Sequence, residues 1–216
     1  MERYKLYLGE TLTEEMYLKT WELDNTIFEG DDVLTKQLAL DWFYLSNKST
    51  IVMWDQIDKK LVGYVTPFLV TKQFSHEYVT TKTGYKQLLT PQNFCKPGDG
   101  VEADIYLFSM VIVEEYRNKR INDKKSKYYG SMAIKVLFEG MCEWLCDVIL
   151  KGTKIEKVYS DGVTFGGTKG LKLYGFKPCF EGGNSTKSHR DFSAKMFRWC
   201  NNYKKLENVL KDKNTQ

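Results

Sequence analysis

The sequence predicts an α/β fold in which a mixed, mostly antiparallel sheet is flanked by helices. Three observations lead to this prediction. A strand-like segment is followed by two helical segments, two β-rich segments are joined by a short polar turn, and the most apolar run precedes a basic loop and a long amphipathic helix. Because the 216 residues slightly exceed the usual size of one domain, we expect a single domain, residues 1–216, with an insertion.

The composition is that of a soluble globular protein, with 42% hydrophobic and 28% charged residues. The net charge of +4 falls short of the basicity of nucleic-acid-binding domains. The first residues alternate between polar and apolar and contain no apolar segment of a signal peptide. We therefore expect a cytoplasmic protein that binds neither nucleic acid nor a membrane. The oligomeric state, homodimer included, is open.

The five cysteines include no Cys-x-x-Cys pair, so we expect no metal site. Cys142 and Cys146 lie four residues apart in a helical stretch and share one face of it, which predicts reduced thiols in the core.

The first elements follow from periodicity and punctuation. Residues 4–8 alternate like a strand, and Thr11 with Glu14 three residues later is typical of a helix start. Gly30-Asp31-Asp32 ends this helix, and apolar residues from Leu34 to Leu45 predict a second. Residues 51–54 and 61–70 flank a polar turn and predict an antiparallel strand pair. Pro67 should limit the second of these strands.

From residue 71 to residue 103 the pattern is lost among Thr, Lys, Gly, Pro and Asn, and we expect a surface insertion there. Residues 104–113 are the most continuously apolar run and predict a central strand buried on both faces. A helix should run from Tyr129 to Val148 and end at Gly152.

The last third of the chain predicts further strands at residues 155–160, 176–180 and 195–200, and a short glycine-rich helix or turn at 164–174. A polar helical extension should occupy residues 202–216. His189, with neighbouring Ser188 and Asp191, is expected on a surface loop because no Gly-x-Ser-x-Gly motif accompanies it.

A basic loop separates the central strand from the long helix. Residues 117–127 contain six cationic side chains: Arg117, Lys119, Arg120, Lys124, Lys125 and Lys127. A strand, a basic loop and a helix N-terminus together suit a phosphate, because free N–H groups and positive charge face the anion. On this basis any phosphorylated ligand fits, and a solvated basic loop is the alternative.

Four motifs resemble the GNAT family of N-acetyltransferases over about residues 49–180. They are Leu61-Val62-Gly63-Tyr64, Met110-Val111-Ile112-Val113 with Tyr116-Arg117, Gly130-Ser131-Met132-Ala133-Ile134, and residues 170–176, which end in Gly175-Phe176. The resemblance implies a sheet splayed between the fourth and fifth strands, acetyl-CoA as co-substrate, and direct attack of an amine on the thioester. It also implies that backbone groups of the strand pair with the pantetheine arm of coenzyme A: Met110, Val111, Ile112 and Val113.

In the family the pyrophosphate loop begins with a residue that matches Arg117, but Asn118, Arg120 and Asn122 stand where glycines are expected. Two registers are therefore open. In one, the loop is residues 117–122, with asparagines adopting unusual backbone angles. In the other, which we prefer, an insertion precedes the loop residues Lys125, Ser126, Lys127 and Gly130, and Ser131 continues into the helix.

Acetyl transfer needs a base for the substrate ammonium, donors for the oxyanion and an acid for the departing thiolate. Glu102 and Asp104 are the candidate bases, together with Glu114 and Glu115, which also flank the central strand. The family often uses a tyrosine as the acid, and Tyr174 is the candidate, although Leu171 stands at the usual position if no gap is allowed. Packing at the sheet edge is the alternative role for Tyr174.

The acceptor is expected to be a small-molecule or peptide amine of unknown identity. The rival function is a non-catalytic coenzyme A-binding or regulatory module on the same fold, which the glycine-poor loop favours. A nucleic-acid-binding role for residues 117–127 is disfavoured because the cations are confined to one loop.

Overall fold

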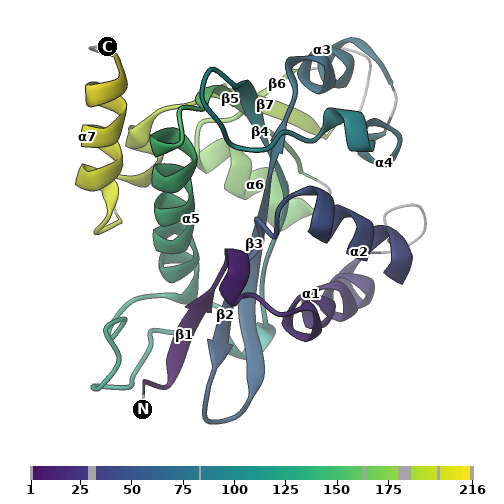
Figure 1. Cartoon of the computed structure of the whole chain (residues 1–216). Coiled ribbons are helices and arrows are strands. Elements are labelled where there is room, and N and C mark those ends of the chain that lie inside the picture. Colours follow the sequence, from purple (N-terminus) through teal and green to yellow (C-terminus); the bar gives the residue numbers. More distant parts are fainter. Residues whose placement is uncertain are drawn as a thin grey trace. The chain divides into compact units, whose positions relative to one another are not determined.

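The computed structural model describes residues 2–28, 33–82, 84–162, 164–179, 186–198 and 200–214. Within these ranges seven strands form one sheet in the order β1-β2-β3-β4-β5-β7-β6 (Figure 1). β4 pairs with β5 in parallel, and β1 with β2, β2 with β3, β5 with β7 and β6 with β7 are antiparallel. The predicted mixed, mostly antiparallel sheet flanked by helices is confirmed.

The chain divides into two compact units and passes from one to the other inside β3, β4 and α5, and again on either side of residues 199–202. Unit 1 comprises residues 1–66, 109–144 and 199–202, and unit 2 comprises residues 67–108, 145–198 and 203–216. Each is described separately below.

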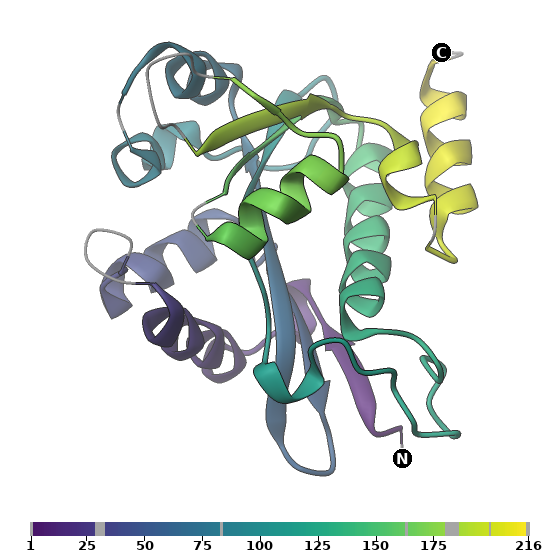
Figure 2. The same ribbon diagram turned by 180° about the vertical axis from the view of Figure 1, so that it is seen from behind.

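Unit 1 holds β1 (Tyr4–Tyr7), η1 (Gly9–Thr11), α1 (Glu14–Ile27), α2 (Lys36–Leu45), β2 (Ile51–Asp55), most of β3 (Lys60–Val70), the end of β4 (Glu102–Ile112), η4 (Glu114–Tyr116) and most of α5 (Ala133–Leu150). In this unit α5 lies on one face of β1–β3, and α1 and α2 lie on the other (Figures 1 and 2). The packing of α5 is close, because a Cβ on Gly140 would lie 2.7 Å from Ile51 Cγ2 and 3.0 Å from Leu6 Cδ1.

Threonine hydroxyls cap both N-terminal helices. The side chain of Thr13 accepts the N–H of Met16 at the start of α1, and Thr35 caps α2 in the same way. The predicted cap at Thr11 is therefore wrong, since its hydroxyl bonds back to the Leu8 carbonyl. The predicted break at residues 30–32 lies outside the described residues.

The predicted β2–β3 hairpin is confirmed, but Pro67 does not limit β3, which continues to Val70. Pro67 lies beyond the last β2 partner, Val65, and before the bridge of Val70 to Phe94. The missing N–H of proline is therefore tolerated because it falls between two stretches of pairing.

Unit 2 holds α3 (Lys72–Thr80), α4 (Tyr85–Leu88), η3 (Pro91–Asn93), β5 (Lys154–Asp161), α6 (Phe165–Leu173), β6 (Lys177–Pro178), β7 (Lys187–Asp191), η5 (Ala194–Phe197) and α7 (Tyr203–Asn214). The segment predicted as a surface insertion contains α3, whose Phe74 and Tyr78 are fully buried and contact the ring of Tyr106. Part of that segment therefore belongs to the core of unit 2. The register of β4 with β5 runs from Glu102 to Leu107.

Three other expectations differ from the structure. Residues 187–191 form β7 rather than a loop, although they are polar and show no alternation, because β5 and β6 supply hydrogen bonds on both sides. Residues 194–197 form a 3-10 helix rather than a strand. The long helix begins at Ala133, which leaves Tyr129 exposed in the preceding loop.

All five cysteines are free, and Cys142 and Cys146 are fully buried in α5, as predicted. None of the described helices has the length and apolar character that crossing a bilayer requires.

Gly63 lets β3 approach β4 closely, because a Cβ there would lie 2.7 Å from the Val111 carbonyl oxygen and 3.2 Å from Ile112 Cα. We expect Gly63→Ala to lower the free energy of unfolding by about 1–3 kcal/mol, since backbone atoms must move to make room. Urea unfolding monitored by circular dichroism measures this. The control is Gly170→Ala in α6, where the Cβ meets open space and stability should rise by about 0.5–1 kcal/mol. Equal stabilities for the two variants would contradict the steric argument.

Candidate functional site

At the end of β4, beyond Leu107, no described strand pairs with the backbone edge that faces away from β3. The Val113 N–H donates to the Val62 carbonyl of β3 at 3.0 Å, and the Val111 carbonyl lies beside Gly63. Because backbone groups alternate along a strand, Met110 and Ile112 direct theirs to the opposite edge. The predicted segment Met110–Val113 therefore offers Met110 and Ile112 for pairing, whereas the Val113 N–H is already engaged.

Arg117 lies next to this edge. Its Nε donates to the Ile112 carbonyl oxygen at 2.8 Å, which keeps the guanidinium at the end of β4. The Ile112 N–H and the backbone groups of Met110 remain the pairing groups of the edge.

The loop between β4 and α5 closes on itself. Arg120 and Met132 form an antiparallel bridge, the Ile121 N–H donates to the Ser131 carbonyl at 2.8 Å, and the Gly130 N–H donates to the Ile121 carbonyl at 2.9 Å. Residues 122–129 are therefore an excursion that leaves the loop after Ile121 and returns at Gly130. The two alternative pyrophosphate loops, residues 117–122 and residues 125–130, meet where the Gly130 N–H bonds to the Ile121 carbonyl. We call this closure the neck of the loop.

Two residues at the neck have left-handed backbones, Asn118 with φ 58° and Gly130 with φ 75°. Asparagine tolerates this conformation better than most residues, and Asn118 stands where a glycine was expected. The first helical bond of α5 runs from the Val136 N–H to the Met132 carbonyl. The N–H groups of residues 133–135 consequently have no acceptor inside the helix and point toward its N-terminal end.

The six cations of residues 117–127 form no ion pair with any carboxylate in the described ranges. Arg120 donates to the Gly130 carbonyl at 2.7 Å, and Lys127 Nζ lies 4.9 Å from the centre of the Tyr128 ring. Ser126 is buried, and its Oγ accepts the Tyr128 N–H. The loop therefore presents exposed cations that form no close ion pair within the described residues, which favours an anionic ligand.

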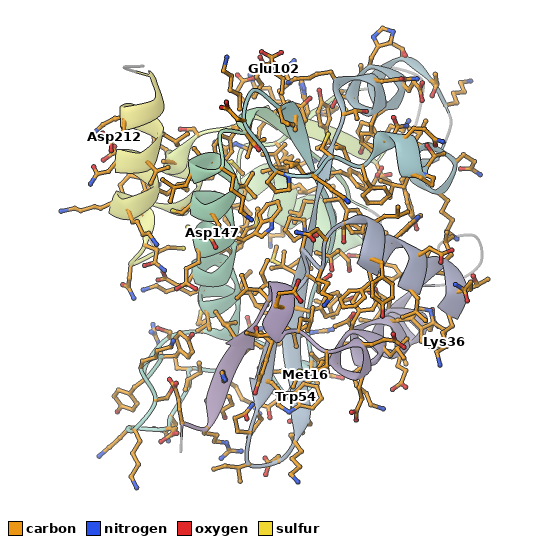
Figure 3. All side chains as sticks on the ribbon, in the orientation of Figure 1. Met16, Lys36, Trp54, Glu102, Asp147 and Asp212 are labelled. Carbon is orange, nitrogen blue, oxygen red and sulfur yellow. The ribbon has the colours of Figure 1, made fainter. Side chains whose placement is uncertain are left out.

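The two predicted bases lie at the start of β4, whereas the open edge is its end. Glu102 is exposed (Figure 3), with Lys154 Nζ 4.0 Å away. Asp104 is buried and accepts from Lys72 Nζ at 2.7 Å, Ser75 Oγ at 2.6 Å and the Lys157 N–H at 3.0 Å. Such full hydrogen bonding is typical of a structural ion pair that ties α3 to β4 and β5.

Glu114 and Glu115 are exposed on η4. Lys60 Nζ lies 2.6 Å from the Glu115 carboxylate, and this hydrogen bond lowers the pKa of Glu115, which makes it a weaker base. Tyr174 is half-buried at the C-terminal end of α6, where its carbonyl accepts from the Arg190 guanidinium.

Comparison with known proteins identifies the fold. No protein-family model matches the chain, and no curated protein sequence does. Among solved structures, NAA60 of Arabidopsis thaliana in complex with acetyl-CoA superposes with a TM-score of 0.51 at 13% identity, over 87% of this chain and 97% of that one. Ard1 of Thermoplasma volcanium superposes with a TM-score of 0.50 at 12% identity, over 88% and 99%. Both are GNAT acetyltransferases.

The chain has the GNAT fold. At such low identities the likeness concerns the fold, so the residues that act on a substrate must be argued from this chain itself. Within the described residues no group of three or more His, Cys, Asp or Glu side chains is placed to hold a metal ion.

Sequence reasoning missed one cluster in this GNAT fold. Ser109 Oγ donates to Asp24 Oδ1 at 3.2 Å, the Tyr64 hydroxyl donates to the same oxygen, and the two hydroxyls lie 3.1 Å apart. Burial raises the pKa of Asp24 to about 6, although both hydrogen bonds oppose the shift. The sequence feature that could have indicated this cluster is the position of Asp24, which lies one helical turn after the buried Thr20 and on the same face of α1.

Proposed function

We propose that this chain transfers an acetyl group from acetyl-CoA to an amine, with acetyl-CoA as the co-substrate and no metal ion. One observation carries the proposal: the open edge of β4 leads directly into a loop whose six cations form no ion pair within the described residues, and then into the N-terminus of α5, all within unit 1. The NAA60 structure, which shares the fold, holds acetyl-CoA.

The proposed cofactor contacts follow the chain. Met110 and Ile112 would pair with the amide groups of the pantetheine arm, as one strand pairs with another. Arg117, Gly130, Ser131 and the free N–H groups of α5 would hold the pyrophosphate, because they combine positive charge with exposed backbone donors. The closed neck of the loop supports this combination over a loop built from Lys125, Ser126 and Lys127.

The acceptor is proposed to be a primary amine of a small molecule or a peptide. Its nitrogen would attack the thioester carbon directly, form the C–N bond and expel the coenzyme A thiolate. A base must first take a proton from the ammonium, and an acid must protonate the thiolate.

The alternative, a module that binds coenzyme A without catalysis, is favoured by Asn118 and Arg120, which replace expected glycines. One experiment separates the two functions. We expect millimolar acetyl-CoA, but not NAD or ATP, to raise the melting temperature, because a ligand that binds only the native state stabilises it by mass action. Thiol release is then measured with panels of small amines and short peptides.

Thiol release that depends on an amine supports the transferase. Binding of acetyl-CoA without thiol release for any amine would support the alternative, a module that binds coenzyme A without catalysis. No shift in melting temperature would contradict both functions.

The loop makes a sharper prediction. If residues 117–121 with Gly130 and Ser131 form the cradle, Arg117→Ala and Arg120→Ala should each weaken coenzyme A binding about tenfold or more, since each removes a charge-assisted contact. Lys125→Ala and Lys127→Ala should then be nearly silent. Isothermal titration calorimetry measures the affinities, and the reverse pattern would restore the register that the sequence favoured.

Two further variants test the backbone of the loop. Gly130→Val should weaken binding, because a side chain would occupy the open space beside the backbone and the positive φ would be strained. Asn118→Ile should do the same through strain, whereas the control Asn122→Ile should not. Unchanged affinity in Arg117→Ala, Arg120→Ala and Gly130→Val, with Lys125→Ala and Lys127→Ala also silent, would show that the loop is only a solvated surface.

Tyr174 is the proposed acid that protonates the departing thiolate. Tyr174→Phe should lower kcat about 10²-fold or more and leave the affinity for acetyl-CoA nearly unchanged, as the loss of a general acid does. Steady-state thiol release and calorimetry on the same preparation measure the two quantities. Full turnover in this variant would assign Tyr174 to packing.

A further inference from the structure

Side chains from three elements of unit 1 meet at Asp24. Asp24 lies on α1, Tyr64 on β3 and Ser109 on β4. Asp24 Oδ1 accepts from the Tyr64 hydroxyl and, at 3.2 Å, from Ser109 Oγ. Both hydroxyls bond Oδ1, so Oδ2 lies outside these two bonds. Ser109 directly precedes Met110, the first residue of the edge proposed to hold the pantetheine arm.

This carboxylate has no cationic partner among the described residues. No described lysine, arginine or histidine forms an ion pair with Asp24. Asp104, which is fully buried and is likewise bonded to a hydroxyl, is also bonded to Lys72 Nζ at 2.7 Å. A half-buried carboxylate without a cationic partner loses part of its hydration on folding, which is unfavourable, and a cationic substrate would supply the missing charge.

Among the described residues, the titratable groups that interact with Asp24 are phenols. Tyr64 faces it from β3, and Tyr17, which interacts electrostatically with it, lies on α1 and donates to the Ala39 carbonyl of α2. From β4 the facing group is the Ser109 hydroxyl. Burial raises the pKa of Asp24 to about 6, and the Tyr64 and Ser109 hydroxyls hold it below the value that burial alone would give. At neutral pH the group is therefore mostly ionised and still able to take up a proton.

We propose that Asp24 is the catalytic base that binds the ammonium group of the acceptor and removes its proton. This assignment rests on the proposed acetyl transfer. Tyr64 and Ser109 are positioning residues, since they orient Oδ1 and leave Oδ2 for the substrate. Glu102, Asp104, Glu114 and Glu115 are thereby displaced as candidates for this role.

In the proposed step the ammonium R–NH₃⁺ gives one proton to the Asp24 carboxylate and becomes a neutral amine. Its lone pair forms the C–N bond with the thioester carbon, and the C–S bond breaks when the tetrahedral intermediate collapses. The second proton leaves the nitrogen and the thiolate takes up one proton, so free coenzyme A forms, and Asp24 returns its proton to solvent.

The first experiment replaces the base and keeps its shape. Asp24→Asn should lower kcat by about 10²- to 10⁴-fold, the usual contribution of a general base, with unchanged affinity for acetyl-CoA by calorimetry. Its melting temperature should stay equal or rise, because the variant removes a half-buried charge that has no cationic partner among the described residues. The matched control is Glu22→Gln on the exposed face of α1, which should leave kcat and melting temperature unchanged.

The second experiment moves the pKa of the base instead of removing it. In the wild type, kcat at saturating amine should fall as the pH drops below about 6, because protonated Asp24 cannot accept a proton. Tyr64→Phe and Ser109→Ala each remove a hydrogen bond that favours the ionised carboxylate, so both should move this acid limb to higher pH. A purely structural cluster would lower stability without moving the limb.

Three outcomes overturn the assignment. Full kcat in Asp24→Asn rejects the base while leaving the acetyl transfer intact. Loss of turnover together with lower melting temperature and weaker acetyl-CoA binding assigns a structural role to Asp24. A wild-type protein that binds acetyl-CoA but releases no thiol with any amine rejects both the proposed function and the base, and is thereby distinguished from the first outcome.

Discussion

The close approach of β3 to β4 at Gly63 is the constraint on which the candidate site depends. The absence of a side chain at Gly63 brings the backbones together, and the Val113 N–H bonds to Val62 as a result. Because one edge of β4 is hydrogen-bonded to β3, the backbone N–H and C=O groups of Met110 and Ile112 are directed to the other edge. The same approach aligns Tyr64 with Ser109, whose hydroxyls lie 3.1 Å apart. One small residue therefore sets both the ligand edge and the hydroxyl pair that holds Asp24.

Charged groups without an ion pair occur at both proposed ligand sites of unit 1. Within the part of the chain that the structure describes, the cations of residues 117–127 form no ion pair with a carboxylate, and Asp24 forms none with a cation. Two other aspartates of the chain are paired with cations, in the ion pairs of Arg3 with Asp55 and of Lys72 with Asp104. Removing a carboxylate from water without a cation costs stability, and ionisable groups in such surroundings are concentrated at functional sites. In the proposed function an anionic cofactor would bind the loop and a cationic acceptor would bind at Asp24, and acetyl transfer from coenzyme A to an amine requires two such ligands of opposite charge.

Asp24 and Asp104 show how surroundings decide the role of a carboxylate. Both are hydrogen-bonded to a hydroxyl, and both contact more than one element. Asp104 also receives a lysine and a backbone N–H, so its lone pairs are occupied and it binds secondary structure together. Among the described residues, the donors to the Asp24 carboxylate are the Tyr64 and Ser109 hydroxyls, both on Oδ1. Sequence position favoured Asp104, because it adjoins the central strand, whereas hydrogen bonding favours Asp24.

Local pattern determined much of this protein. The apolar run of β4, the basic loop and the 3.6-residue period of α5 are visible in sequence. In each of them, burial or exposure gives a pattern of apolar and polar residues that are neighbours in the chain. β7 was not predicted, because its polar residues show no alternation and its hydrogen bonds come from other strands of the sheet, β5 and β6. Only the tertiary structure decided where the loop closes, at Ile121 and Gly130, which edge of β4 is open, and that Asp24 joins Tyr64 and Ser109. Those contacts link residues 40 and 85 positions apart, and no local periodicity specifies them, since they arise from how whole elements pack.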